Sequence, residues 1–177
     1  MSSTTEHELL AAARETLAQG EALLAEISGD DYTRKLPVAF NASIGGHYRH
    51  CLDHFRTLLA AAAAGDLNYD QRERGTLVEN DRAAALKVTR ELMAGYARLD
   101  PTLLGRTLAV TCKTSYAASG SQASPSTVGR EVMYAVAHAV HHYALIGIMA
   151  GIMNIKTPAG FGVAPSTLKQ QQAVAAA

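Results

Sequence analysis

The chain has 177 residues, a length that suits one domain with a hydrophobic core. Sixteen basic residues balance 16 acidic ones without a Lys/Arg cluster, which argues against a nucleic-acid partner because phosphate binding normally requires a basic surplus. The two cysteines, Cys51 and Cys112, form no CxxC motif, and residues 1–6 lack the pattern of a signal peptide. We therefore expect a cytoplasmic protein.

Amphipathic periodicity begins close to the N-terminus. A first helix is predicted to open with the capping box Ser3-Thr4-Thr5-Glu6 and to end before a connector over residues 30–40. The second helix is predicted to begin near Asn41 or Ser43, both favourable N-caps, and to end at Gly65. Its apolar residues recur every three or four positions, the pattern by which helices pack into bundles.

The middle of the chain is less regular. Residues 66–75 are charged and aperiodic, which predicts an irregular connection to a third helix over about residues 80–99. Residues 108–112 weakly indicate a strand, and residues 119–125 indicate a loop.

A long apolar segment follows. The sequence Ser124-Pro125 suits the entry of a fourth helix that extends to about Met153. Residues 132–153 are apolar enough to cross a bilayer, but histidines near the middle of that stretch would be costly in lipid. We therefore predict a buried bundle helix and no membrane partner, followed by a C-terminal extension over residues 156–177 whose end frays.

These elements predict an all-α fold. The expected architecture is an up-down four-helix bundle with a long connection between the third and fourth helices. A single domain is expected over residues 1–177, with its helical body at about residues 4–155.

Histidines are the most informative residues of the chain. Six of the seven form two clusters, His47, His50 and His54 on the second helix and His138, His141 and His142 on the fourth. Residues three or four positions apart lie on one helical face, so His138 and His142 are able to direct both imidazoles at one point. Packing of the two helices would bring both clusters into one site.

Neutral imidazole is a good ligand for zinc, nickel, copper or iron. Three such ligands with an open fourth position would leave room for water or substrate, so the clusters predict one divalent metal ion. Spacing alone leaves the ligand from the second helix open among its three histidines. The competing interpretation is a histidine network without metal. Two weaker candidates are Cys51 as a nucleophile beside histidine and Glu131 as a base or a partner of the ligands.

Two motifs resemble those of the DinB-like superfamily of metal-binding bundles. They are residues 43–55, Ser-Ile-Gly-Gly-His-Tyr-Arg-His-Cys-Leu-Asp-His-Phe, and residues 138–142, His-Ala-Val-His-His. The resemblance covers about residues 5–155, and residues 161–167 are similar to the end of a bacterial branch of that superfamily.

The resemblance implies a ligand set. In the superfamily one histidine of the second helix and two of the last helix bind a metal, which corresponds here to His50, His138 and His142. His54 and His47 would then be alternate ligands or partners of the bound ligands.

The resemblance also implies an activity. Superfamily members of known function include thiol-dependent transferases and isomerases that use mycothiol, bacillithiol or glutathione. The leading hypothesis is therefore an enzyme of thiol-transferase or hydrolase type, with zinc or nickel, a low-molecular-weight thiol as cosubstrate and a small-molecule substrate.

Two other hypotheses compete with this enzyme. One is a non-catalytic metal-binding or stress-related interaction module whose site is closed by His54 or His47 as a fourth ligand. The other is a helical interaction protein that binds no metal tightly. In each case the apolar surplus on the first and fourth helices predicts a homodimer.

Overall fold

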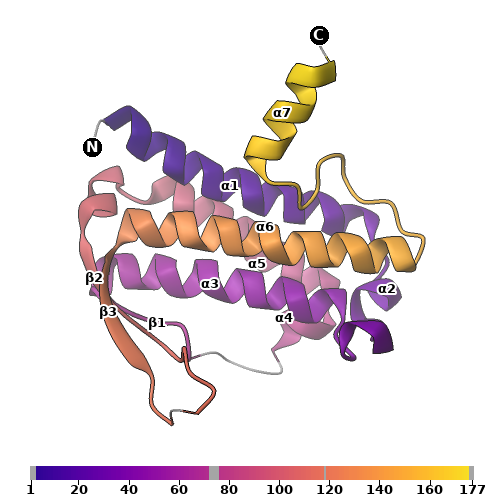
Figure 1. The fold of residues 1–177 in the computed structure, drawn as a ribbon, viewed down its shortest axis with the longest axis horizontal. Coiled ribbons are helices and arrows are strands. Elements are labelled where there is room, and N and C mark those ends of the chain that lie inside the picture. Colours follow the sequence, from indigo (N-terminus) through magenta and orange to yellow (C-terminus); the bar gives the residue numbers. More distant parts are fainter. Residues whose placement is uncertain (1–2, 72–75, 118, 176–177) are drawn as a thin grey trace.

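Four long helices form a bundle in the computed structural model, which describes residues 3–71, 76–117 and 119–175 (Figure 1). These helices are α1 (Ser3–Glu26), α3 (Ile44–Ala64), α5 (Arg82–Arg98) and α6 (Val128–Ile152). Short helices connect them: α2 (Gly29–Thr33), η1 (Pro37–Ala39), α4 (Leu77–Asn80) and η2 (Pro101–Gly105). The predicted four-helix bundle is confirmed.

The caps of α3 explain why this helix begins and ends where it does. The Ser43 hydroxyl accepts a hydrogen bond from the Gly46 N–H at 3.0 Å, which satisfies one of the donors exposed at the helix start. Gly65 ends the helix with φ +95°, a conformation that glycine adopts without steric cost. Both predicted boundaries of this helix are confirmed.

The helices α3 and α5 run parallel, although they are consecutive long helices along the chain. The Tyr48 and Thr89 hydroxyls lie 2.8 Å apart, and the Tyr96 hydroxyl donates to the Phe55 carbonyl at 3.0 Å. Contacts thus advance in the same direction along both helices, which differs from the predicted up-down order. The connection between them is long enough to cross the bundle, because an extended chain covers about 3.3 Å per residue.

A small sheet lies at the end of the bundle where α3 ends and α6 begins (Figure 1). Its strands are β1 (Asp66–Asn68), β2 (Thr107–Cys112) and β3 (Gln122–Thr127). The central strand β2 pairs in parallel with β1 and antiparallel with β3. The predicted strand over residues 108–112 is confirmed, and the long connection that precedes α6 contains β2 and β3.

Two stretches that were predicted to be irregular contribute strands to this sheet. The predicted connection over residues 66–75 contains β1, while its residues 72–75 lie outside the described part of the chain. The predicted loop over residues 119–125 contains residues 122–125 of β3. Neither strand is rich in β-branched residues, so their pairing with β2 is a tertiary effect that local propensity does not indicate.

The predicted entry of the last helix is wrong. Ser124 and Pro125 belong to β3, which pairs with β2, and Pro125 lies opposite Ala109. Proline is tolerated there because β3 is an edge strand of the described sheet. The helix α6 begins three residues later, with the Thr127 hydroxyl accepting a hydrogen bond from the Arg130 N–H at 3.2 Å.

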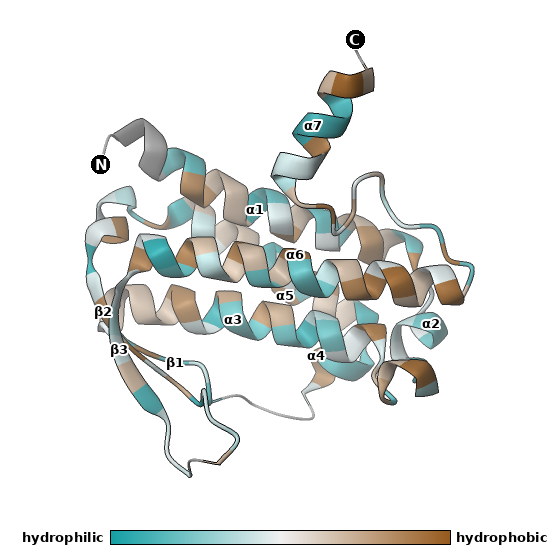
Figure 2. Ribbon diagram, viewed as in Figure 1, coloured by the Kyte–Doolittle hydropathy of each residue, from teal (hydrophilic) through white to brown (hydrophobic). Residues whose placement is uncertain are grey.

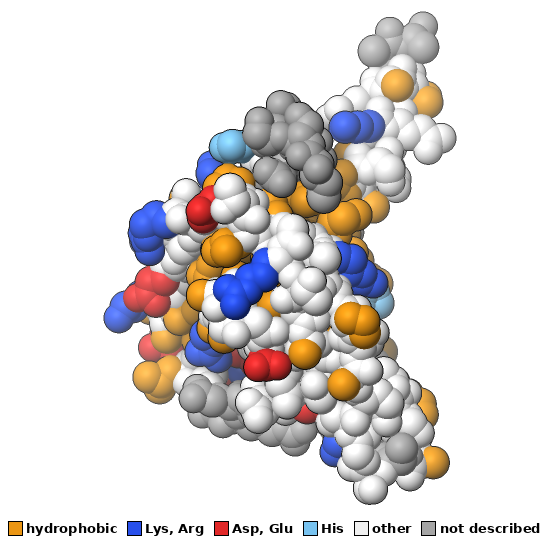
Figure 3. All heavy atoms as spheres, turned by 90° about the vertical axis from the view of Figure 1, so that its left-hand side faces the viewer, with side chains coloured by type: hydrophobic (Ala, Val, Ile, Leu, Met, Phe, Trp, Pro, Cys, Tyr) orange, Lys and Arg blue, Asp and Glu red, His pale blue; other side chains and the backbone are white. Residues whose placement is uncertain are grey.

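The C-terminal part of the chain is anchored on α6 and then leaves the bundle. The Phe161 ring stacks on the Tyr143 ring with centroids 4.7 Å apart. Beyond it, α7 (Pro165–Ala175) projects from the body and has no buried residue (Figures 1 and 3). The prediction of a frayed end is therefore wrong for residues 165–175, which are helical.

The helix α6 is long and apolar enough to cross a membrane (Figure 2). It nevertheless contributes Val132, Ala139 and Ile146 to the core, and it packs against α1 and α3. One helix of this kind is weak evidence for a membrane span, because the core helices of bundles have the same composition. On the end of the molecule shown in Figure 3, basic and acidic side chains are interspersed.

Candidate metal centre

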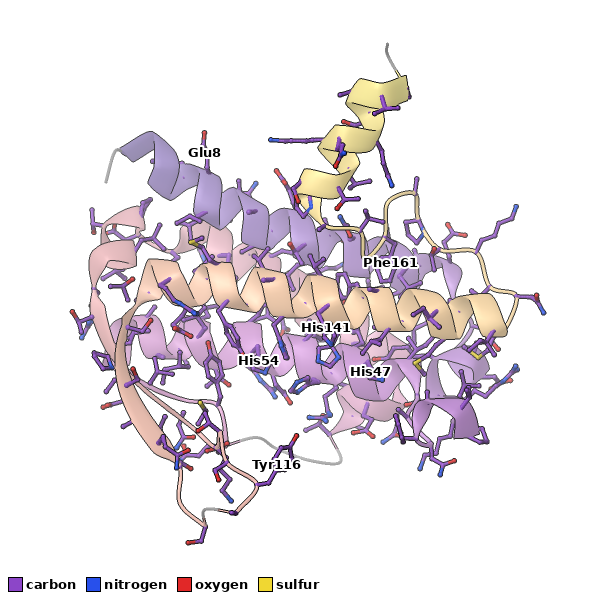
Figure 4. All side chains as sticks on the ribbon, in the orientation of Figure 1. Glu8, His47, His54, Tyr116, His141 and Phe161 are labelled. Atoms are coloured by element: carbon purple, nitrogen blue, oxygen red, sulfur yellow. The ribbon has the colours of Figure 1, made fainter. Side chains whose placement is uncertain are left out.

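The antiparallel packing of α3 and α6 brings the two histidine clusters together. His50 Nε2 and His138 Nε2 lie 2.9 Å apart, and His47 Nδ1 and His142 Nδ1 lie 3.0 Å apart. The first histidine of α3, His47, thus faces the last histidine of α6, His142. Figure 4 shows His47 and His54 of α3 and His141 of α6 on the same side of the bundle.

Three of these histidines form a group that fits a metal ion. One ring nitrogen from each of His50, His138 and His142 lies within 4.8 Å of the others, and all three side chains are half-buried. Ligand nitrogens about 2.0–2.1 Å from a tetrahedral zinc ion are themselves about 3.3 Å apart, so the group has a suitable size. Its donors are imidazoles alone, which suits zinc or nickel better than calcium or magnesium.

The remaining histidines surround this group without belonging to it. His54 is 5% exposed, and its ring contacts those of His50 and His138, with centroids 4.8 and 4.3 Å away. His47 contacts His142 through the nitrogen pair described above, which fixes the orientation of the His142 ring. His141 is exposed, and its ring lies 5.3 Å from that of His142.

Burial keeps part of the cluster neutral. Loss of hydration, reinforced by the neighbouring histidines His138, His47 and His141, lowers the pKa of His142 to about 4. Loss of hydration and the nearby His141 also lower the pKa of His47. A neutral imidazole retains the lone pair that binds metal, so these shifts favour ligand chemistry at ordinary pH.

The lowered pKa of His142 predicts that the metal-free protein becomes less stable in acid. In the unfolded chain this histidine takes up a proton at about pH 6.5, whereas in the folded protein it does so only near pH 4. The unfolded state thus binds more protons between these values, so the free energy of unfolding falls as the pH falls through this window. Thermal unfolding in EDTA from pH 7.5 to 4.5 measures this effect.

The matched variants for this prediction are His142→Asn and His7→Asn. The first is expected to reduce the slope of Tm against pH, because it removes the histidine whose pKa is lowered to about 4, while His47 still contributes. The second changes an exposed residue of α1 and is expected to retain the wild-type slope. Equal slopes in all three proteins would show that His142 titrates normally in the folded state.

Two tyrosines border the histidines on the side nearest the sheet. The Tyr134 ring stacks on that of His138 with centroids 5.5 Å apart, one helical turn earlier on α6. The Tyr69 ring lies 4.7 Å from that of His54. Glu131, a candidate from the sequence, is buried and accepts a hydrogen bond from the Tyr69 hydroxyl at 2.8 Å. Glu131 is thus linked to the histidines through the Tyr69 ring, which contacts His54.

The other sequence candidate, Cys51, does not belong to the site. Its thiol is completely buried in the core, and burial raises its pKa well above the usual range. A thiol of this kind is a poor nucleophile, so the Cys-His alternative loses its support.

Sequence reasoning missed Tyr69 and Tyr134. The position of Tyr134, four residues before His138, was a usable signal because it places both side chains on one face of α6. No comparable signal exists for Tyr69, which follows β1 in a segment without periodicity and reaches the site through the sheet.

Comparison with known proteins identifies relatives of this chain. The family model of the DinB superfamily matches residues 8–146. The crystal structure of a DinB-like protein, YjoA of Bacillus subtilis, superimposes with a TM-score of 0.61 and 17% sequence identity. The match covers 85% of this chain and 96% of that one, and at this identity it shows the fold alone.

One relative belongs to a much longer protein. FK506-binding protein 5 of Rhizopus delemar is 34% identical over 103 residues, which make up 58% of this chain. These residues cover 27% of the fungal protein, so this chain matches about a quarter of its length.

Proposed function

The chain belongs to the DinB superfamily, and we propose that it binds one divalent metal ion, zinc or nickel, through His50, His138 and His142 and acts on a low-molecular-weight thiol. The observation that carries this proposal is the convergence of three half-buried imidazoles from two antiparallel helices. A rigid helix pair holds ligands more accurately than loops do.

The open character of the group favours an enzyme over a closed binding module. Neither His47 nor His54 belongs to the described group that fits the ion, so no fourth protein ligand is assigned among the described residues. A catalytic metal site keeps a position for water or substrate, whereas a structural site has four protein ligands. When bound, a divalent ion lowers the pKa of a coordinated thiol or water and so supplies a nucleophile near neutral pH.

The surrounding side chains have separate tasks in this proposal. His47 orients the ring of His142 through the contact between their Nδ1 atoms. His54 and Tyr134 pack against the ring of His138 and restrict its rotation. Exposure of part of each ligand leaves one side of the site accessible to a small molecule.

Cobalt substitution tests whether a thiol reaches the metal. Protein purified without a histidine tag is loaded with Co²⁺ and titrated with 2-mercaptoethanol, with ethylene glycol as the matched control without sulfur. We expect a sulfur-to-cobalt charge-transfer band with the thiol alone, because thiolate is a good ligand for this class of metal. A cobalt spectrum that does not change with thiol, in protein that does hold the ion, would contradict thiol chemistry and favour the closed binding module.

A further inference from the structure

A cavity of about 280 Å³ lies between the sheet and the first turns of α6, beside the candidate metal centre. Its walls include Tyr69, Val110, Cys112, Arg130, Glu131 and Tyr134. The volume is slightly below the range of about 300–1,000 Å³ that is typical of ligand pockets, so the cavity suits a small molecule.

Two tyrosines link this cavity to the histidines. Tyr134 lines the cavity and stacks on His138, while Tyr69 lines it and contacts His54. The centroid distances of 5.5 and 4.7 Å are those of rings in direct contact. A molecule in the cavity would therefore lie one aromatic ring away from the histidine group.

The body of the cavity is suited to a flat apolar group. The rings of Tyr69 and Tyr134 lie 5.5 Å apart and supply aromatic surface. Val110 and Cys112 add small apolar side chains from β2. Aromatic walls of this kind favour ligands with a ring or another flat apolar part.

The charged side chains at the cavity indicate which charge its ligand carries. The Glu131 carboxylate accepts hydrogen bonds from the Tyr69 hydroxyl at 2.8 Å and the Ser126 hydroxyl at 2.6 Å, and it lies 3.6 Å from Arg130 Nη1. Its oxygens are thus already engaged by the protein, so the glutamate has little capacity for a cationic ligand.

In contrast to the Glu131 carboxylate, the Arg130 guanidinium has N–H donors beyond the one that faces Glu131. Its side chain is 63% exposed, and the ion pair with Glu131 involves one of its two terminal nitrogens. The guanidinium lies over the Tyr134 ring, 5.6 Å from the centroid, which holds it at the cavity. A planar guanidinium pairs readily with a carboxylate, and the remaining N–H groups are available for that purpose.

We propose that this cavity binds the organic substrate of the metal centre, and that the substrate is a small carboxylate with an aromatic or similarly flat apolar body. Its ring packs on the aromatic surface that Tyr69 and Tyr134 present to the cavity, and its carboxylate pairs with Arg130. The role as substrate rests on the proposed function, whereas binding in the cavity does not require the metal.

Three probes of equal size test the preference for an anion. They are 2-naphthoate, 2-naphthylmethanol and 2-naphthylmethylammonium, and their fluorescence is easily followed because the chain has no Trp. We expect 2-naphthoate to bind about tenfold more tightly than the alcohol, since a charge-assisted pair contributes that much at a partly exposed site. Tightest binding of the ammonium compound, or equal binding of all three, would overturn the proposal.

Variants locate the binding. Arg130→Gln is expected to reduce naphthoate affinity about tenfold while leaving the alcohol unaffected, and Cys112→Phe is expected to weaken all three probes by filling the cavity. The matched control Arg98→Gln removes an exposed arginine at the end of α5 and should behave as wild type. An equal loss in Arg98→Gln would show that the anion binds through net charge, and the cavity would then be excluded as its site.

Two further measurements distinguish a failure of this proposal from a failure of the proposed function. They are the proximity of bound 2-naphthoate to the metal and the metal content of the protein. Co²⁺-loaded protein should broaden the proton resonances of bound 2-naphthoate, whereas Zn²⁺-loaded protein should not. Metal content should be unchanged in Arg130→Gln. Naphthoate binding in protein that takes up no metal would refute the proposed metal function alone. A metal-loaded protein that does not bind naphthoate would refute the proposed ligand of the cavity alone.

Discussion

Protein in which His138 is replaced by alanine is expected to lose its bound metal. In wild type we expect about one zinc or nickel ion per chain, held by the three imidazoles that converge between α3 and α6. Removing one ligand should weaken binding by more than about a hundredfold, since changes to the hydrogen-bond partners of ligands alone cost 10- to 100-fold. Elemental analysis and competition with a chromophoric chelator measure the loss.

The neighbouring histidines provide graded controls for this experiment. His50→Ala and His142→Ala should match His138→Ala, because all three residues belong to the same group. His47→Ala should retain the metal with about tenfold lower affinity, since it removes only the partner of His142. His141→Ala changes an exposed side chain and should behave as wild type.

The same series assigns the ligand from α3. If His54→Ala loses the ion as completely as His138→Ala while His50→Ala keeps it, His54 is the true ligand and the present assignment is wrong. Unfolding of the wild-type protein gives a second measure, because a metal at a hundred times its Kd stabilises the folded state by about 2.7 kcal/mol. EDTA should remove this stabilisation from wild type and leave Tm of His138→Ala unchanged.

The second large effect is expected at Gly45, in the first turn of α3. A Cβ at this position would collide with the backbone carbonyl of Glu79 on α4 and with the Tyr32 ring. The carbonyl has little freedom to move, since the Tyr32 hydroxyl donates to the Val78 carbonyl at 2.7 Å and Arg49 pairs with the Glu79 carboxylate at 3.0 Å. We expect Gly45→Ala to lower the free energy of unfolding by about 3 kcal/mol.

The adjacent glycine supplies a control, because its substitution is expected to change the free energy of unfolding in the opposite direction. A Cβ at Gly46 would meet its nearest neighbour, the Ser43 hydroxyl oxygen, at 3.5 Å, which is an ordinary contact. Gly46→Ala should therefore raise the free energy of unfolding by about 0.5–1 kcal/mol, as the loss of a helical glycine does. Urea denaturation of both variants measures the difference. Similar stabilities would show that α4 moves away from α3 without cost.

The shared helical face of His138 and His142 could be predicted from the sequence, because their spacing is a local property. His138 and His142 are one helical turn apart, and any helix places them on one face. The choice among the histidines of α3 was harder, since it depends on how α3 is rotated against α6. The apolar stripe predicts that Tyr48 and Phe55 are buried, as they are, but how these side chains pack against the other helices is specified only by the assembled bundle.

The parts of the fold that were missed depend on contacts between distant residues. β3 contains Ser124-Pro125, which locally favours a helix start, and its strand conformation comes from pairing with β2. The parallel arrangement of α3 and α5 likewise depends on the path of a connection whose sequence has no periodicity. Tyr69 reaches the histidines only because β1 pairs with β2, 43 positions further along the chain.

The position of the sheet at one end of the bundle has a consequence for how this protein is able to diverge. The proposed ligands all lie on α3 and α6, whereas β2 and β3 contribute Val110, Cys112 and Ser126 to the neighbouring cavity. Substitutions or insertions in the hairpin between β2 and β3 therefore alter the cavity without moving an imidazole. Under the proposed function, selection is thus able to change which molecules bind while the candidate metal centre is kept, and exchanging hairpins between relatives is a direct way to test for new selectivity.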